Sequence, residues 1–321
     1  MTVASTSIDR VIALAAPAKL NLSLAVLARR PDGYHDLESL MVGVTLGDTL
    51  AIRAADEPGV RLHVRYGPGI AGTPLARDVP PGPDNLVVRA AEMLAAEAGV
   101  ERGLEIELVK LVPAGAGLGG GSSDAAAALR GAARAWGLDW NAARLAELGA
   151  RLGSDGPFFC AGGPAIARGR GERLEPVSGI PPLPAVIACP AAGLSTAAVY
   201  AGCAPDPAHR GDAARLAGAL ARGGLRAAIP LVHNDLEPPA RRLCPDVDRL
   251  LAALAAAGAA CPRLTGSGSA CFALARTATE ARGIAARLAA ARGPDGLRLW
   301  PGVFTVRLAT APAGARAAPR A

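Results

Sequence analysis

Residues 113–124 read Pro-Ala-Gly-Ala-Gly-Leu-Gly-Gly-Gly-Ser-Ser-Asp, and this stretch decides how the rest of the chain is interpreted. The apolar run Leu104–Val112 precedes it, and an alanine-rich run follows it. Five glycines within seven residues allow positive φ angles and let the backbone approach a ligand with no Cβ in between. We expect Ser122 or Ser123 to cap a helix that follows, so that free N–H groups and the helix dipole converge on a phosphate.

Three interpretations of this glycine loop compete. Three of its glycines match the dinucleotide-binding pattern G-x-G-x-x-G. That pattern needs a second strand ending in an acidic residue about 20 residues on, whereas this chain continues with two helical runs. A P-loop needs a lysine at the end of the loop, where this chain has Gly-Ser-Ser. A flexible turn rarely needs so many glycines and two serines before a helix, so the sequence favours phosphate binding by another kind of loop.

Composition narrows the class of protein. The 321 residues exceed what one hydrophobic core usually supports, so we expect two domains. Six scattered cysteines without a C-x-x-C pair indicate reduced thiols and a cytoplasmic location. No apolar run approaches the roughly 18 residues that span a bilayer, so we expect no membrane partner. The net charge of +6 comes from dispersed arginines without interleaved aromatic residues, so we expect no nucleic-acid partner.

Lysine is almost absent from the chain. Of the 34 lysines and arginines only Lys19 and Lys110 are lysine, which suggests that a compact ammonium is needed at those two places. Lys19 lies in an alternating run over 11–27, and period-2 spacing puts it on the same strand face as Asn21. A solvated strand edge is an equally good interpretation of that pair. Asn85 is expected to cap the helix that follows it.

The remaining pattern predicts a mixture of strands and helices. Strands are expected at 44–54 and 60–64 in a meander, at 104–112, in a hairpin over 161–177, at 185–189 and at 297–308. Helices are expected at 86–98, 123–136, 141–152, 245–258 and 278–292, whereas residues 203–230 carry little information. Antiparallel hairpins among helices indicate an α+β fold rather than a doubly wound sheet.

The proline-rich run Ile180–Pro184 is typical of a crossing between domains. We therefore expect an N-terminal domain at 1–178 and a C-terminal domain at 179–311. The alanine-, proline- and arginine-rich tail at 312–321 is expected to be disordered.

Three turns carry candidate residues. Asp155 follows Gly153-Ser154, where an aspartate is ordinarily an Asx-turn residue. The turn within Leu264–Phe272 is either a tight hairpin or a second phosphate-binding nest. A further turn leads to Tyr34 and His35, which form either ordinary loop surface or a stacking surface for a planar ring.

Three motifs together resemble those of the galactokinase/homoserine kinase/mevalonate kinase (GHMP) superfamily. They are Pro17–Leu22, the loop at 113–124 and Thr265–Ser269, in the order of the superfamily and covering nearly the whole chain. The resemblance implies an α+β fold with an N-terminal ATP-binding domain like domain 2 of ribosomal protein S5 and a C-terminal ferredoxin-like domain. Asp32–His35 and Leu152–Phe158 resemble the branch that phosphorylates the 2-hydroxyl of a cytidine-diphosphate-linked methylerythritol in the non-mevalonate isoprenoid pathway.

The resemblance implies a role for each matching residue. Asp155 would be the base that accepts the substrate hydroxyl proton, and Lys19 would keep that carboxylate ionised and stabilise developing charge. The glycine loop would hold the ATP phosphates, with two more residues near the adenosine: Pro113, Ala114, Gly115, Ala116, Gly117, Leu118, Gly119, Gly120, Gly121, Ser122, Ser123, Asn85 and Lys110. Asn21 and His35 would read the cytidine of the substrate, Tyr34 and Tyr200 would pack on its ring, and Thr196 would lie near it. The substrate would also contact Gly266, Ser267 and Gly268. ATP and Mg²⁺ are the implied cofactors, with no metal ligands assigned, and the protein would be a monomer or homodimer acting on a small molecule.

This sequence departs from the superfamily pattern at two positions and leaves alternatives open. Ala116 stands where glycine is frequent, and Gly156 stands where a β-branched residue is common. A kinase of homoserine or mevalonate is the nearest alternative, although such substrates carry no base for Tyr34 and His35 to contact. A non-catalytic nucleotide-binding protein is a more distant alternative.

Overall fold

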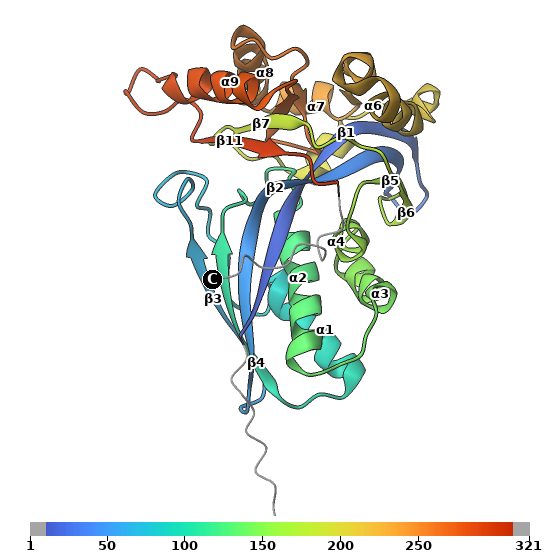
Figure 1. Ribbon diagram of the computed structural model, residues 1–321, viewed down its shortest axis with the longest axis vertical. Coiled ribbons are helices and arrows are strands. Elements are labelled where there is room, and N and C mark those ends of the chain that lie inside the picture. The colour runs from blue at the N-terminus through green and yellow to red at the C-terminus, as the bar shows by residue number, and fades with distance from the viewer. Residues whose placement is uncertain (1–10, 311–321) are drawn as a thin grey trace, which may run out of the picture.

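The computed structural model describes residues 11–310, which form two β-sheets and the helices that cover them (Figure 1). The strands are β1 (Ile12–Arg29), β2 (His35–Ala55), β3 (Val60–Tyr66), β4 (Gly103–Lys110), β5 (Ala165–Gly169), β6 (Arg173–Pro176), β7 (Pro184–Cys189), β8 (His233–Asn234), β9 (Arg263–Leu264), β10 (Cys271–Leu274) and β11 (Gly302–Arg307). The helices are α1 (Leu86–Ala98), α2 (Gly120–Ala135), α3 (Ala142–Leu152), α4 (Gly156–Ala161), α5 (Thr196–Ala201), α6 (Asp212–Ala228), α7 (Glu237–Leu243), α8 (Pro245–Ala256) and α9 (Ala278–Ala290). Two 3₁₀ turns, η1 (Pro207–His209) and η2 (Ile229–Leu231), flank α6. The expected tail at 312–321 lies outside the described residues.

The larger sheet has seven strands, in the order β3-β4-β2-β1-β8, with β5 and β6 branching from β2. Helices α1 and α2 cover one of its faces (Figure 1). The predicted meander is wrong, because β3 pairs with β4 in parallel and not with β2. Parallel neighbours need a crossover connection, and α1 supplies it between β3 and β4.

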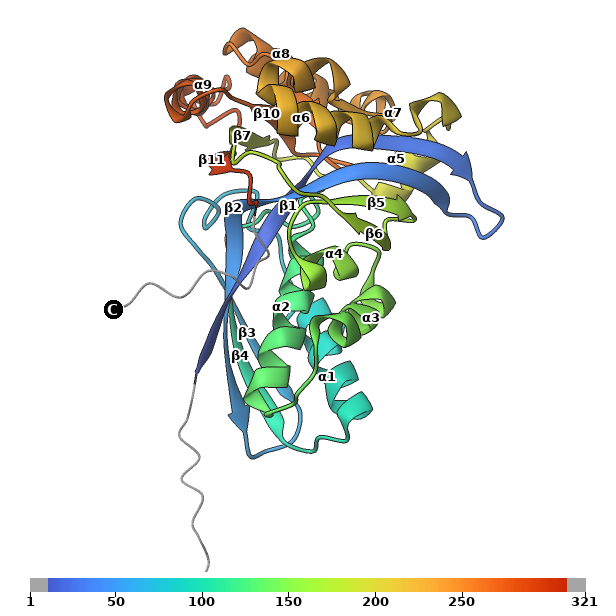
Figure 2. The ribbon, with the colours of Figure 1, turned by 45° about the vertical axis from the view of Figure 1, so that its right-hand side comes forward.

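The long strands β1 and β2 connect the two parts of the molecule. They have 18 and 21 residues, and in Figure 2 they curve out of the larger sheet and pass beneath the helices of the C-terminal half. Their register shifts between Pro17 and Lys19 and again between Asn21 and Ser23. Bulges of this kind bend a strand and re-aim its side chains, which places the Lys19–Asn21 segment at the bend.

The smaller sheet has four antiparallel strands, in the order β11-β7-β10-β9. Its core is continuous with that of the N-terminal half, because Leu20 and Leu22 of β1 belong to the same buried cluster as Ile187 and Phe272. β8 also crosses over and pairs in parallel with β1. The proposed domain boundary after residue 178 stays a prediction.

Local corrections concern the ends of elements. α2 begins at Gly120, with Gly119 at the N-cap position and φ +71°, so Ser122 and Ser123 lie inside the first turn and cap nothing. Asp155 is not in an Asx turn but immediately precedes the short helix α4. The last strand is shorter than predicted because Pro301 cannot donate a ladder hydrogen bond.

Within residues 11–310, no helix combines the length and apolar character needed to cross a membrane. All six cysteines are free thiols.

Candidate active site

A cleft of about 940 Å³ lies where the glycine loop, the β1–β2 hairpin, α5 and the turn at 266–268 meet. It collects most of the site residues predicted from the sequence. The predicted residues that line it are Lys19, Asn21, Tyr34, His35, Gly115, Gly117, Gly119, Ser122, Asp155, Thr196, Tyr200, Gly266, Ser267 and Gly268. These residues come from widely separated parts of the sequence, so the fold brings them into one site.

The glycine loop ends at the N-terminus of α2, a helix of 16 residues. Gly115, Gly117 and Gly119 all have φ between 66° and 80°, a region that other residues rarely adopt. No side chain caps the helix, so its first N–H groups are available to a ligand at the cleft. Together with the positive end of the helix dipole, this arrangement is suited to a phosphate.

The second glycine–serine turn packs directly on the glycine loop. A Cβ on Gly117 would overlap the carbonyl oxygen of Thr265, and a Cβ on Gly266 would lie 2.9 Å from the carbonyl oxygen of Gly117. The backbone N–H of Ala270 also donates to the carbonyl of Ala116 at 3.0 Å. The two turns therefore form one backbone-lined wall, and glycine is required there by close approach.

Lys19 and Asp155 form the charged centre of the cleft. Lys19 is 4% exposed, and its Nζ lies 3.9 Å from the Asp155 carboxylate. Burial lowers the pKa of the Lys19 ammonium, and the Asp155 carboxylate partly offsets that effect. The arrangement pairs a carboxylate that can accept a proton with a cation that can stabilise developing negative charge.

Asn21 orients the ammonium of Lys19. Its Oδ1 accepts a hydrogen bond from Lys19 Nζ, and its Nδ2 donates to Ser39 Oγ at 2.8 Å. Ser39 Oγ in turn donates to the carbonyl of Ser23, and the Asn21 N–H donates to Thr265 Oγ1. At 5% exposure Asn21 is not part of a solvated strand edge, so that alternative is wrong.

Aromatic rings also line the cleft. The ring centroids of His35 and Tyr200 are 5.2 Å apart, with a tilt of 32°. Burial lowers the pKa of His35, and the charge of Arg29 adds to that shift, so the neutral imidazole is favoured. The ring of Tyr34 is exposed and lies 4.6 Å from the Arg170 guanidinium, a cleft residue that sequence analysis missed.

Thr196 lines the cleft beside the turn at 266–268. Its hydroxyl lies 2.9 Å from the hydroxyl of Ser267, within hydrogen-bond distance. The N-terminus of α5 is thereby tied to the glycine–serine turn.

Nine of the predicted ATP contacts do not line the cleft: Pro113, Ala114, Ala116, Leu118, Gly120, Gly121, Ser123, Asn85 and Lys110. The first seven belong to the glycine loop itself, whereas the last two lie outside it. Asn85 caps α1 by accepting from the Val87 N–H at 2.9 Å, and its Nδ2 donates to the carbonyl of Pro80. Lys110 is 2% exposed and forms ion pairs with Asp48 and Asp124. Its ammonium lies beneath the glycine loop, where a Cβ on Gly120 would come within 3.4 Å of Nζ.

The buried carboxylates around Lys110 were not predicted from the sequence. Asp48 accepts from the backbone N–H groups of Leu111 and Val112 and thereby fixes the start of the glycine loop. Burial raises the pKa of Asp124 to about 8. Burial also acts to lower the pKa of Lys110, but the Asp124 and Asp48 carboxylates outweigh it, and the net shift is upward. Asp124 belongs to the opening motif, whereas nothing near Asp48 in the sequence signals its role.

Comparisons with known proteins agree with this geometry. Residues 85–163 match the family model of the GHMP kinases N terminal domain, and residues 212–295 match that of the GHMP kinases C terminal. The chain is 43% identical to the 4-diphosphocytidyl-2-C-methyl-D-erythritol kinase of Pelotomaculum thermopropionicum, covering 86% of this chain and 93% of that protein. It is 41% identical to the kinase of the same name from Moorella thermoacetica, covering 87% and 95%.

Solved structures of kinases are also similar to this chain. A crystal structure of 4-(cytidine 5'-diphospho)-2C-methyl-D-erythritol kinase superposes with a TM-score of 0.73 at 35% identity, covering 92% of this chain and 99% of that one. Homoserine kinase from Cytophaga hutchinsonii has a TM-score of 0.70 at 21% identity, covering 97% and 98%, and shares the fold alone.

The fold and the cleft define a GHMP-type kinase, with an α+β architecture of N- and C-terminal GHMP domains. Within that class, the chain belongs to the 4-diphosphocytidyl-2-C-methyl-D-erythritol kinase family.

Proposed function

We propose that this protein is an ATP-dependent kinase that phosphorylates the 2-hydroxyl of 4-diphosphocytidyl-2-C-methyl-D-erythritol in the non-mevalonate route to isoprenoid precursors. The observation that carries the proposal is the placement of the Lys19–Asp155 pair between the glycine loop and the His35–Tyr200 rings, in a single cleft. The glycine loop therefore suits a phosphoryl donor, the Lys19–Asp155 pair suits a reacting hydroxyl, and the His35–Tyr200 rings suit a cytosine ring.

The glycine loop and α2 hold the ATP phosphates in this proposal. Backbone N–H groups at the uncapped start of α2 donate to phosphate oxygens, while the buried Lys110 ammonium, whose charge is already balanced by Asp48 and Asp124, supports the loop from beneath. The loop lacks the lysine of a P-loop, and Lys19 of β1 is the lysine on the cleft wall that can supply countercharge. Asn85 and Lys110 act on ATP through the position of the loop rather than by direct contact with adenosine.

Asp155 and Lys19 act on the substrate hydroxyl. The 3.9 Å separation of ammonium and carboxylate is longer than a direct hydrogen bond, so a hydroxyl can bind both groups. Asp155 orients the hydroxyl and accepts its proton as the oxygen attacks the γ-phosphoryl group, and Lys19 stabilises the charge on that group. Phosphoryl transfer needs mainly such positioning and electrostatic stabilisation.

The aromatic end of the cleft recognises the cytidine. Tyr200 and Tyr34 present ring faces, and the neutral imidazole of His35 can donate to and accept from the edge of the base. Asn21, Thr196 and the 266–268 turn hold the methylerythritol portion near Lys19. A substrate without a base would leave this end of the cleft unfilled, which argues against homoserine or mevalonate.

Mg²⁺ fits the donor set of the cleft. It takes oxygen ligands and usually keeps substrate phosphates and waters among them. The Ser122 hydroxyl and the Asp155 carboxylate are oxygen donors on the cleft wall and would hold the ion against the ATP phosphates. When bound, the ion neutralises charge on the β- and γ-phosphates.

We further propose a cytoplasmic enzyme whose partner is this small molecule rather than nucleic acid or membrane. Whether it is a monomer or a homodimer stays a prediction to be tested by its mass in solution.

The deciding experiment measures ADP release from Mg·ATP with 4-diphosphocytidyl-2-C-methyl-D-erythritol. Wild type is compared with Lys19→Ala and Asp155→Asn, and with Asp139→Asn as a matched control at an exposed position between α2 and α3. We expect turnover in wild type and the control and its collapse in both cleft variants, with ATP still bound. Turnover of homoserine or mevalonate instead would disprove the substrate, and no turnover of any of them would disprove the kinase.

A further inference from the structure

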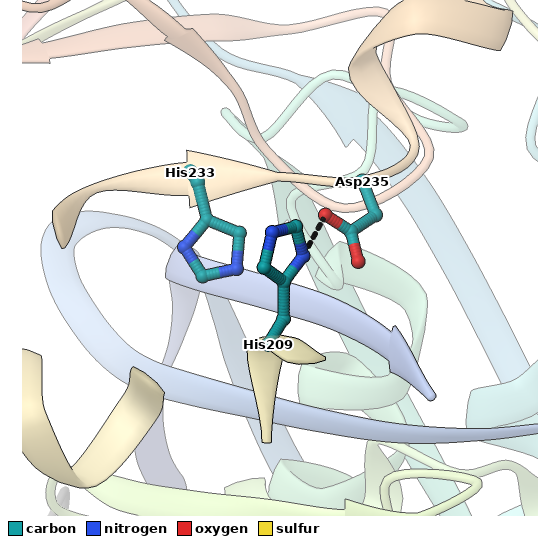
Figure 3. Close-up of side chains that lie close together, drawn as sticks. All are labelled: His209, His233 and Asp235. Atoms are coloured by element: carbon teal, nitrogen blue, oxygen red, sulfur yellow. Dashed lines mark ion pairs between the residues drawn. The ribbon is translucent and has the colours of Figure 1, made fainter. Parts of the chain in front are cut away.

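Two of the four histidines in the chain lie together and are not among the residues that line the cleft. His209 belongs to η1 and His233 to β8, and their ring centroids are 4.9 Å apart with a tilt of 52°. Asp235 follows β8, and its carboxylate faces His209 (Figure 3). One ligand atom from each of these three residues lies within 4.8 Å of the others. The kinase reaction proposed above uses none of the three.

Two ring nitrogens of this cluster have no hydrogen-bond partner among the described residues. His233 Nδ1 lies 3.2 Å from the carbonyl oxygen of Leu231, so Nδ1 carries the proton and donates there. His233 Nε2 is then an unprotonated lone pair, buried and without a hydrogen bond. His209 Nδ1 is 2.8 Å from Asp235 Oδ1, yet the two atoms lack hydrogen-bond geometry and this nitrogen too is unsatisfied. Buried lone pairs left in this way call for an explanation.

The carboxylate of Asp235 is held firmly by backbone contacts. Its Oδ2 accepts from the Val26 N–H at 2.8 Å, and its own N–H donates to the carbonyl of Leu24 at 2.9 Å. With Oδ2 engaged by β1, Oδ1 remains directed at the histidines. Hydrogen bonds of this kind, including the one from His233 Nδ1 to the Leu231 carbonyl, hold metal-ligating side chains in a fixed orientation in protein metal sites.

We propose that His209, His233 and Asp235 bind Zn²⁺. Two imidazole nitrogens and one carboxylate oxygen form a set that zinc accepts, whereas Mg²⁺ prefers oxygen ligands alone. Zinc bonds of about 2.0–2.2 Å place tetrahedral ligand atoms about 3.3 Å apart. The longest separation, which is no more than 4.8 Å, must therefore shrink by about 1.5 Å at most, a modest rotation for the partly exposed side chain of His209.

The fourth ligand is a water molecule or the Asp212 carboxylate. Asp212 Oδ2 lies 3.7 Å from His233 Nε2, while its Oδ1 is ion-paired with Arg215 in the first turn of α6. Because His209 and His233 are partly exposed, the ion has a route from solvent.

The consequence of the site is structural. The ion would tie the segment around His209 to β8 and so to β1, to which the same segment is already joined by the hydrogen bond from the Asp206 N–H to the carbonyl of Val26. The chain just before this segment includes Cys203 and Pro205, which line the cleft. Zinc would therefore stabilise the edge of the cleft formed by Cys203 and Pro205 without taking part in the reaction.

The test measures zinc binding directly and does not depend on the kinase assay. Chelator-treated full-length protein is titrated with ZnCl₂ by calorimetry in excess Mg²⁺, and thermal unfolding is followed with and without zinc. His233→Asn keeps an amide donor for the Leu231 carbonyl but removes the Nε2 ligand, and His209→Gln removes the second ligand. His63→Gln, at an exposed position on β3, is the matched control.

We expect one zinc per chain and a zinc-dependent rise in Tm for wild type and His63→Gln. Affinity should fall at least about tenfold in both site variants, with no rise in Tm. Absence of binding in wild type, or wild-type affinity kept in the two site variants, would overturn the proposal. If the site variants do not fold, cobalt(II) added to wild type decides: the strong visible absorption of a four-coordinate ion supports the site, and the weak absorption of hydrated cobalt refutes it.

Discussion

Lys19 Nζ lies 3.9 Å from the carboxylate of Asp155, the first group on the central strand β1 and the second at the start of α4. The ammonium is nearly inaccessible to water, whereas the carboxylate keeps about a third of its surface exposed. Burial of the Lys19 ammonium lowers its pKa, so Lys19 loses its proton more easily than an ordinary lysine. The pKa of the other lysine, Lys110, is raised instead.

The two lysines should therefore titrate apart. In protein labelled with ¹³C-lysine, NMR should show the Lys19 signal titrating below 10.5 and the Lys110 signal still charged above it. The ammonium exists below its pKa, so a function that needs charged Lys19 is present at low pH and lost as pH rises through the lowered value. Lys19→Arg assigns the signals by removing one of them. Two superimposed titrations, or the reverse order, would contradict the structure.

Gly117→Ala should abolish kinase activity, because the added Cβ would meet the carbonyl oxygen of Thr265, which cannot move without displacing the second turn. Gly137→Ala is the matched control: its φ of +69° is similarly unfavourable, but nothing lies within 4 Å of the added Cβ. The control should lose about 1–2 kcal/mol of stability and keep its activity. Urea unfolding and steady-state kinetics separate the two effects. Equal losses in both variants would mean that backbone conformation alone matters at Gly117.

Asp124→Asn should flatten the pH dependence of stability. With a folded-state pKa of about 8 against an ordinary 3.8, Asp124 keeps a proton in the folded state that the unfolded chain releases. The free energy of unfolding of the wild type therefore falls as pH rises from 4 to 8, and the variant lacks this contribution. Urea unfolding at a series of pH values measures the slopes, and Asp139→Asn should retain the wild-type slope. An unchanged slope in Asp124→Asn would show that its carboxyl is ionised throughout.

Tyr200→Ala should raise KM for the cytidine substrate by about tenfold or more, since stacking of a base on an aromatic ring contributes roughly 1–3 kcal/mol. Tyr200→Phe keeps the ring next to His35 and should have a KM close to that of wild type. The KM for ATP should stay unchanged in both variants, because Tyr200 packs against His35 and is not part of the glycine loop. Steady-state kinetics with each substrate varied provide the measurement, and a rise in KM for ATP alone would assign the ring to the other nucleotide.

Local signals in the sequence predicted much of this structure. Asn85 and the helix after it, and the shared face of Lys19 and Asn21, follow from capping and from strand periodicity. The glycine loop leads into helix α2 as predicted, although the cap is Gly119 rather than a serine, and phosphate binding there stays a prediction. Resemblance to a superfamily, rather than pattern, singled out Asp155, which by itself looked like a turn residue.

Long-range contacts explain what could not be predicted. Lys110 was expected near the adenosine rather than in a buried ion pair, because its partner Asp48 lies 62 residues away in the sequence. The parallel pairing of β3 with β4 depends on α1 crossing the sheet, which no strand pattern encodes. The region at 203–230 gave no motif, yet it contributes His209 to a cluster with β8.

The shared strands β1 and β2 have a mechanical consequence. Each runs without interruption from the larger sheet to the helices of the C-terminal half, and the buried cluster around Leu20 and Phe272 spans the same junction. A hinge between the halves would have to break strand pairing and open that cluster. Closure of the two halves around the substrates would therefore be energetically costly. Folding of the chain fixes the width of the cleft. The side chains that line the cleft therefore determine which substrates bind.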